Sequence, residues 1–195
     1  MSPQDRSHRY VGPVDLLHAV RPGSGGRSIG SAAAFAGWIA EQAAAELSEP
    51  FPLVVGTDGV LRPAPRRSEH VMCAGGETML SAGEIGFVRE AGHWVAEVSN
   101  HSTGYCPDES SWPAVARALD DIGLRRPPGF THPVVFRRCP RCQEHAIVRE
   151  GHFVCVFCGA ESPDTWNVDP GARRGPGRAV IPVRPGRRGG GTPPR

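Results

Sequence analysis

Apolar residues recur at helical spacing between Ser31 and Ser48. Phe35, Trp38 and Ile39 fall at positions i, i+3 and i+4, which places them on one face of a helix. Ser31 is a favourable N-cap residue, and alanines with high helix propensity fill much of the segment. The pattern therefore predicts a helix over residues 31–48 that packs its apolar face on a sheet.

The next segments carry short apolar runs with the length of strands. Leu53–Val55 and Val60–Leu61 flank Gly56–Gly59, where the Asp-Gly pair predicts the tight turn of a β-hairpin. Aromatic and β-branched residues alternate partly with smaller or polar ones in Trp94–Val98. Three further strands are predicted, over His70–Cys73, Met79–Val88 and His93–Ser99. Together these segments predict a mostly antiparallel sheet.

A polar loop, Asn100–Pro107, precedes a second helical pattern. Apolar residues at helical spacing cover residues 112–122, and Asp108 or Ser110 is in position to cap this helix. Gly123 is suited to end it. Helices beside an antiparallel sheet define the fold class as α+β, here a helix packed on a mostly antiparallel sheet and followed by smaller elements.

Two CxxC pairs form the clearest chemical pattern in the chain. Cys139 and Cys142 are followed, after twelve residues, by Cys155 and Cys158. Four thiolates at this spacing suit a closed tetrahedral Zn²⁺ site, so we expect a structural zinc ribbon. A redox CxxC would need a βαβ context that is missing here, and an iron–sulfur cluster is less typical of one short hairpin. Catalytic zinc is disfavoured because it keeps one ligand position open.

The residues between the two pairs are expected to form the hairpin of the ribbon. Ala146–Val148 and His152–Val154 are predicted strands, joined by a turn at Glu150-Gly151. His145 and His152 are interpreted as bystanders, or at most as substitute ligands. A subdomain of about 20 residues buries too little apolar surface alone, so the metal is expected to be required for its folding.

Basic and aromatic residues surround the first pair of cysteines. Such a mixture can contact phosphates and stack on bases, which would suit a nucleic acid. The alternative is that at least two of the phenylalanines form the small core of the ribbon, and we favour this alternative. The residues concerned are Arg137, Arg138, Arg141, Phe136, Phe153 and Phe157.

The polar loop is the second candidate site. His101, Ser102 and Tyr105 are candidate binding residues. An alternative enzymatic function would use His101, Tyr105 and Glu84, with ADP-ribosyl transfer as the reaction class. No motif of matching spacing supports this enzyme. If it exists, it should gather these side chains and His70 around one concave pocket.

The stretch SEHVMCAGGETMLSAGEIGF, followed by EVSNHSTGYCPDESSW and the CxxC pairs, resembles a family of small bacterial proteins typical of GC-rich actinobacterial genomes. The resemblance covers roughly residues 68–167. More distantly, the AGE and STGYCP motifs are similar to the "AGE … SGHYRP" hairpin-loop-helix module of plant IQ-motif calmodulin-binding proteins and some bacterial effectors. This resemblance implies a fold rather than an activity. Gly83, Glu84, Ser102, Tyr105 and Pro107 match the module, whereas Gly104 and Cys106 depart from it.

Charge is unevenly spread along the chain. Residues 170–195 hold seven arginines and no acid, whereas residues 1–169 hold 15 basic and 20 acidic residues, a net charge of −5. The chain has no lysine, which the codon usage of a GC-rich genome explains more simply than selection against lysine modification. We expect four parts: a flexible N-terminal segment over 1–30, an α+β domain over 31–128, a zinc ribbon over 129–167 and a disordered basic tail over 168–195.

The expected location follows from what the chain lacks. No stretch approaches the ~20 apolar residues that span a bilayer, and residues 1–10 lack an apolar signal core. We therefore expect a cytoplasmic protein with no membrane partner, whose thiols stay reduced. The predicted function is a non-enzymatic zinc-binding adaptor of the bacterial cytoplasm. Its expected partner is a protein, and a nucleic acid bound through the arginine-rich tail and the ribbon is the second candidate.

Overall fold

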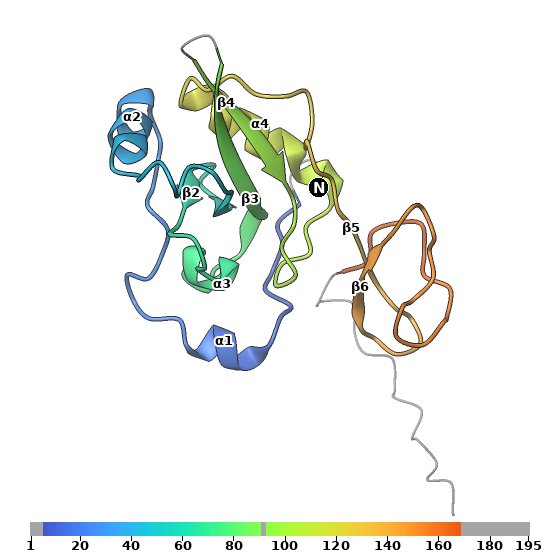
Figure 1. Ribbon diagram of the computed structural model, residues 1–195. Helices are drawn as coiled ribbons and strands as arrows, with labels where there is room; N and C mark the ends of the chain where they lie inside the picture. The colour runs from blue at the N-terminus through green and yellow to red at the C-terminus, as the bar shows by residue number, and fades with distance from the viewer. Residues whose placement is uncertain (1–5, 91–92, 169–195) are drawn as a thin grey trace, which may run out of the picture.

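The structure is a computed structural model that describes residues 6–90 and 93–168 (Figure 1). No helix within these ranges is long and apolar enough to cross a bilayer. Of the predicted disordered tail over 168–195, only Val168 is among the described residues, and it is buried. The elements are α1 (Val14–His18), α2 (Ala32–Ala40), β1 (Phe51–Gly56), β2 (Leu61–Pro63), α3 (His70–Cys73), β3 (Met79–Glu90), β4 (His93–Ser99), α4 (Trp112–Asp121), β5 (Val135–Arg138) and β6 (His145–Val148).

The predicted antiparallel sheet is present. Its strand order is β2-β1-β3-β4, and every neighbouring pair is antiparallel. The Asp-Gly turn joins β1 to β2, and Gly59 there adopts a φ of +78° that suits glycine. β3 and β4 form a long hairpin in the centre of Figure 1, with Gly86 paired to Glu97. The α+β fold class is therefore confirmed.

The main core lies between one face of the sheet and helices α2 and α4. Phe35 and Trp38 of α2 contact Phe87 of β3, and Trp38 also meets Phe51 of β1 with ring centroids 5.1 Å apart. Leu119 of α4 is buried in the same cluster. The apolar stripe predicted for α2 is thus the surface that covers the sheet.

Helix α2 is shorter than its sequence pattern predicted. Ser31 caps it as expected, because the Ala34 N–H donates to the Ser31 hydroxyl oxygen at 3.2 Å. The helix ends at Ala40, although helix-forming residues continue to Ser48. Tertiary packing supplies most of the stability of a short helix, and in the remainder only Leu47 packs against the core.

Helix α4 begins and ends at the residues expected from the sequence. It follows a 3-10 turn over Glu109–Ser111, where the Asp108 carboxylate accepts a 2.9 Å hydrogen bond from the Ser110 N–H. Gly123 follows the helix with a φ of +71°. Asp108 thus caps the 3-10 turn that leads into α4, whereas the N-cap residue of α4 itself is Ser111, whose side chain forms no capping bond.

The opposite face of the sheet is covered at one end only. There, Val54 of β1 and Ala82 of β3 pack against Val71 of α3 and against Tyr105 from the polar loop. The other end of this face, along the β3–β4 hairpin, carries no helix (Figure 1). The arrangement leaves one stretch of sheet open beside the ribbon.

Residues 70–73 form helix α3, so the strand predicted there is wrong. The Met72 and Cys73 N–H groups both donate to the Glu69 carbonyl, rather than to a neighbouring strand. An apolar run of four residues does not distinguish a strand from one helical turn. Gly75 and Gly76, with φ of +62° and +81°, then reverse the chain into β3.

Residues 6–30 were expected to be flexible, and in the structure they run along the α+β domain. His8 is 2% exposed and forms a bridge with Met79, while Ile29 is 1% exposed and forms a bridge with Leu61. Between these two anchors, α1 contacts α3. Tyr10, Leu16 and Val20 also pack on the domain, but neither anchor stands out in the hydrophobic pattern, because each is a single buried residue in polar surroundings.

The ribbon is built on a different hairpin from the expected one. β5 pairs with β6, which places the first CxxC pair in the turn between these strands. Residues 153–154 pair with residues 161–162, and of the expected hairpin the turn at Glu150-Gly151 and the Arg149–His152 bridge are present. The predicted pairing of 146–148 with 152–154 is therefore wrong, because the first CxxC turn is flanked by β5 and β6 and the second by the bridge between Val154 and Glu161.

Asn100 joins the ribbon to the sheet. It is fully buried, and its side-chain amide donates to the carbonyls of Pro107 at 3.0 Å and Val134 at 2.8 Å. Its side-chain oxygen accepts a 2.7 Å hydrogen bond from the Val134 N–H. A second link comes from Trp166, whose indole N–H donates to the Cys106 carbonyl at 2.9 Å.

Candidate metal centre and adjoining cleft

The four predicted cysteines converge at one point of the ribbon. Their Sγ atoms all lie within 4.8 Å of one another, and the Cys139–Cys158 and Cys142–Cys155 pairs are each 3.6 Å apart. A tetrahedral site with metal–sulfur bonds of about 2.3 Å needs sulfur–sulfur distances of about 3.8 Å. The four thiols can therefore hold one metal ion with little movement.

Both CxxC turns have the same backbone. The Cys139 N–H donates to the Glu144 carbonyl at 2.8 Å, and the Cys155 N–H donates to the Ala160 carbonyl at the same distance. The residue four positions after the first cysteine adopts a positive φ in each turn, +67° for Gln143 and +69° for Gly159. We call these turns the first knuckle (residues 139–144) and the second knuckle (residues 155–160).

The thiols of the cluster influence one another. Burial acts to raise the pKa of Cys139, but the backbone N–H groups of Cys142 and Arg141 donate to its sulfur and have the larger combined effect. The pKa of Cys139 is therefore lowered, to about 6. The Glu144 N–H lowers the pKa of Cys142, whereas burial and the three neighbouring thiols raise it, to about 12. Ionising the whole set therefore requires a cation at its centre, which a divalent metal supplies.

A metal held by this cluster has no open position for a substrate. Four thiolates complete a tetrahedral shell. His145 and His152 are not among the clustered ligands, as expected, and within the described residues no other His, Cys, Asp or Glu joins the group. The chemistry of the donor set therefore favours a structural role over a catalytic one.

The surface of the second knuckle is apolar. Val156 and Phe157, the two residues between Cys155 and Cys158, are 68% and 64% exposed. Val154, just before the knuckle, is 50% exposed. Phe136 is buried and Phe153 is partly buried, so two of the three phenylalanines belong to the interior of the ribbon, as predicted. We call Val154, Val156 and Phe157 the apolar tip.

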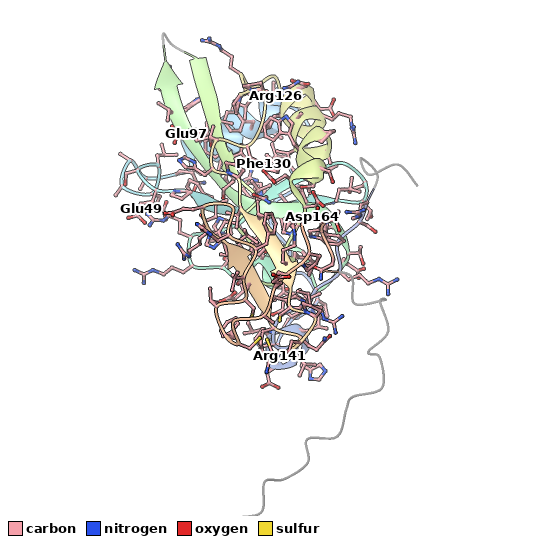
Figure 2. All side chains as sticks on the ribbon, turned by 90° about the vertical axis from the view of Figure 1, so that its right-hand side faces the viewer. Glu49, Glu97, Arg126, Phe130, Arg141 and Asp164 are labelled. Atoms are coloured by element: carbon pink, nitrogen blue, oxygen red, sulfur yellow. The ribbon has the colours of Figure 1, made fainter. Side chains whose placement is uncertain are left out.

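The arginines near the first knuckle have different environments. Arg137 is 9% exposed, donates to the carbonyls of Phe136, Pro163 and Asp164, and lies over the Phe153 ring. It therefore holds the ribbon together and is not available to a phosphate. Arg141 is exposed at the far end of the ribbon, where Figure 2 shows it beside the yellow cysteine sulfurs.

A cleft of about 530 Å³ lies where the open end of the sheet meets the ribbon. Its floor is the β3–β4 hairpin, with Glu84, Gly86 and Glu97. Apolar side chains build much of the rim. Leu47 and Pro50 line the cleft from the segment before β1, and Val134 and Ile147 line it from the ribbon. Such a volume is in the range of ligand-binding clefts.

The structure separates the three candidate residues of the polar loop. His101 lines the cleft, and its Nδ1 lies 3.9 Å from the Glu84 carboxylate. Ser102 is fully buried, and its hydroxyl has no hydrogen-bond partner among the described residues. Tyr105 is also fully buried, donates to the Glu77 carbonyl at 2.8 Å, and has its pKa raised by burial.

The geometry does not assemble the alternative enzyme. His101 and Glu84 share the cleft, but Tyr105 packs under the opposite end of the sheet. His70 does not line the cleft; its Nε2 is 2.6 Å from the Gly83 carbonyl, and burial lowers its pKa. The pocket required for nucleotide transfer by these residues is therefore not formed.

Sequence reasoning missed the residues that connect the parts. Asn100, Arg137 and Trp166 each bond to backbone atoms far away in the chain. Their roles depend on tertiary contacts, and no local motif signals them. The cleft was also missed, because it forms between segments more than 30 residues apart.

Comparisons with protein-family models, with curated proteins and with solved structures found no match. The function of the site is therefore inferred from its geometry and chemistry.

Proposed function

We propose that this chain is a zinc-dependent adaptor that binds a protein partner through the apolar tip of its ribbon. The observation that carries the proposal is the exposure of Val156 and Phe157 between two metal-ligating positions. A large aromatic side chain fixed in an exposed position is a typical anchor of a protein interface. The metal would hold both residues at the surface, because the turn that presents them is closed by the cluster.

Zinc is the proposed metal for chemical reasons. Four thiolates in a tetrahedral arrangement are the donor set of structural zinc sites, and hard cations such as Mg²⁺ prefer oxygen ligands. Iron can occupy the same donor set, so the metal content of the purified protein is the deciding measurement. The proposed location in the cytoplasm would keep the thiols reduced.

The first prediction concerns metal content. Elemental analysis of the purified chain should find one zinc per chain, and Cys142→Ser should reduce this to less than about one tenth because a three-thiolate site binds weakly. Cys73→Ala is the matched control, since Cys73 is a buried thiol outside the cluster. Iron in place of zinc, or full zinc retention by Cys142→Ser, would contradict the proposal.

The second prediction concerns the partner. A photo-crosslinking amino acid in place of Phe157 should form a covalent adduct with another protein in the native host. The same amino acid in place of Val14, which is 58% exposed on α1, is the control and should form none. A nucleic-acid adduct at position 157 would favour the alternative partner. The absence of any adduct would refute the assignment of the apolar tip.

The nucleic-acid alternative has weaker support from the ribbon. Arg137 is engaged internally, and the second knuckle presents valine and phenylalanine rather than basic side chains. Arg141 remains an exposed cation at the first knuckle. The actinobacterial resemblance supports only a bacterial protein with this order of parts, and it does not indicate a partner.

A further inference from the structure

The cleft between the sheet and the ribbon combines acidic and apolar surface. Glu84 and Glu97 lie on neighbouring strands of its floor: Glu97 on β4 is paired with Gly86 on β3, and Glu84 lies two residues before Gly86. A Cβ added at Gly86 would be in ordinary contact with Glu97, at 3.7 Å or more, so the Glu97 side chain lies beside Gly86 on the floor. Figure 2 shows Glu97 and Glu49 on the same side of the molecule.

The two floor carboxylates are available to a ligand. Glu97 has no ion-pair partner within the described residues, and Glu84 has only the His101 ring at 3.9 Å. Glu49, a third carboxylate in the lining, is already paired with Arg66. Arg149 also lines the cleft from the ribbon, but it supplies one positive charge against the two floor carboxylates. The ligand should therefore be cationic, and the apolar rim indicates that it also carries apolar groups.

A segment of this chain fits that description. Residues 173–184 read RRGPGRAVIPVR, in which arginines flank the apolar run AVIPV. This segment contains no acid, whereas residues 1–169 carry a net charge of −5. Guanidinium groups form two parallel hydrogen bonds with a carboxylate, which suits arginine to paired glutamates in a partly apolar site.

The origin of this segment lies close to the cleft. Val168 is buried against Phe136 of β5, and the Asn167 side chain bonds both backbone groups of Arg138. Arg173 follows Val168 by five residues, and an extended chain covers up to about 17 Å in that length. Val134, which lines the cleft, lies two residues before Phe136, a separation of about 7 Å along a strand.

We propose that residues 173–184 bind in cis in the cleft formed by the β3–β4 hairpin, the segment before β1 and the ribbon. Arginines of the segment pair with Glu84 and Glu97, and residues 179–183 contact the apolar rim. This inference is independent of the apolar tip and of the identity of the metal.

The test is a double-mutant comparison of amide NMR spectra on the full chain. One variant replaces four arginines of the segment by glutamine, at positions 173, 174, 178 and 184. In the wild-type background, this change should shift the signals of Gly86, Val88 and His132. In a Glu84→Gln/Glu97→Gln background, the same arginine changes should leave these signals unmoved. The carboxylates that the arginines would pair with are already absent there.

A matched control separates the cleft from general charge effects. Glu109→Gln/Asp121→Asn removes the same charge at exposed positions outside the cleft, and the arginine changes should still shift the cleft signals in that background. Zinc content and spectral dispersion show that each variant is folded. Cleft signals that do not move in the wild-type background would overturn the proposal, as would shifts that grow with protein concentration, which indicate binding by a second copy.

A second measurement uses proteolysis. Trypsin cleaves after Arg174 and Arg178, and bound residues are protected in proportion to the occupied fraction. Cleavage at these positions should be roughly fivefold faster in Glu84→Gln/Glu97→Gln than in the wild type, since two partly exposed ion pairs are lost. The Glu109→Gln/Asp121→Asn control should match the wild type. Equal rates in all three proteins would refute the cis contact.

Discussion

Asn100 is a buried polar side chain that links two distant segments through backbone hydrogen bonds. It satisfies three backbone groups at once, the Pro107 carbonyl and both the carbonyl and the N–H of Val134. Through these three bonds, the buried amide holds the polar loop at a fixed distance from the residues that lead into β5. Because the amide is fully buried, water does not replace these bonds when the side chain is removed.

Asn100→Ala should therefore destabilise the protein by about 2 to 4 kcal/mol, because it leaves buried backbone groups of Val134 and Pro107 without partners. The free energy of unfolding in urea measures this loss. His101→Ala, the adjacent exposed position, is the control and should change stability by less than about 0.5 kcal/mol. Similar values for the two variants would show that the Asn100 bonds are not needed.

At the scale of elements, the β3–β4 hairpin sets the shape of both the polar loop and the cleft. Gly83 lies where the hairpin passes closest to the start of the loop. A Cβ at Gly83 would lie 2.0 Å from the Ser99 carbonyl oxygen, a distance that no side chain can occupy. Gly86, three residues later, has room for a Cβ. The two glycines of one strand therefore have different reasons to be glycine.

Gly83→Ala should lower the free energy of unfolding by about 3 kcal/mol or more, because the backbone of Ser99 and Asn100 must move away. Gly86→Ala should cost less than about 1 kcal/mol, since it adds a methyl group at the cleft floor without a clash. Thermal and urea unfolding of the two variants provide the comparison. Equal tolerance of both changes would contradict this account of the hairpin.

Elements that carry a long hydrophobic or cysteine pattern could be predicted from the sequence, whereas elements that carry only a short apolar run could not. The stripe of Phe35, Trp38 and Ile39 identified α2, and the cysteine spacing identified the metal cluster. The run at residues 70–73 was too short to show its period. The pairing of β6 with β5 is set by the backbone of the first knuckle, and the hydropathy of the residues does not predict it. The cleft requires three distant segments to meet, so no local pattern contains it.

At the scale of the whole molecule, the N-terminal segment ties the sheet to the ribbon. His8 Nδ1 is 3.1 Å from the Leu80 carbonyl, and its Nε2 accepts a 3.2 Å hydrogen bond from the Asp108 N–H. Its ring meets Trp166 edge to face, and Arg6 lies over the same indole while pairing with Asp108. These contacts require the neutral imidazole. Burial lowers the pKa of His8 to about 4.

The sign of the pH effect follows from this lowered pKa. Above pH 6.5 His8 is neutral in both states, and between pH 6.5 and 4 only the unfolded chain gains a proton, so stability falls as the pH falls. From pH 7 to pH 4.5 the wild type should lose about 2 to 3 kcal/mol more than His8→Gln, which keeps one donor and one acceptor. Urea unfolding at both pH values measures the difference.

His18→Gln is the control for this comparison, because His18 is exposed on α1. It should follow the wild-type pH dependence, and any effect of acid on the cysteine cluster is common to all three proteins. A His8→Gln variant with the same pH dependence as the wild type would show that the buried imidazole is not the group responsible.

The cleft has one wall on the sheet and one wall on the ribbon, and the ribbon is closed by the cysteine cluster. If the ribbon folds only around its metal, as its small size predicts, the two sites are thermodynamically linked. A ligand of the cleft would then favour the closed ribbon and raise the affinity for the metal, and the metal would raise the affinity of the cleft by the same factor. The availability of metal in the cell would then regulate binding at a site that contains no metal ligand.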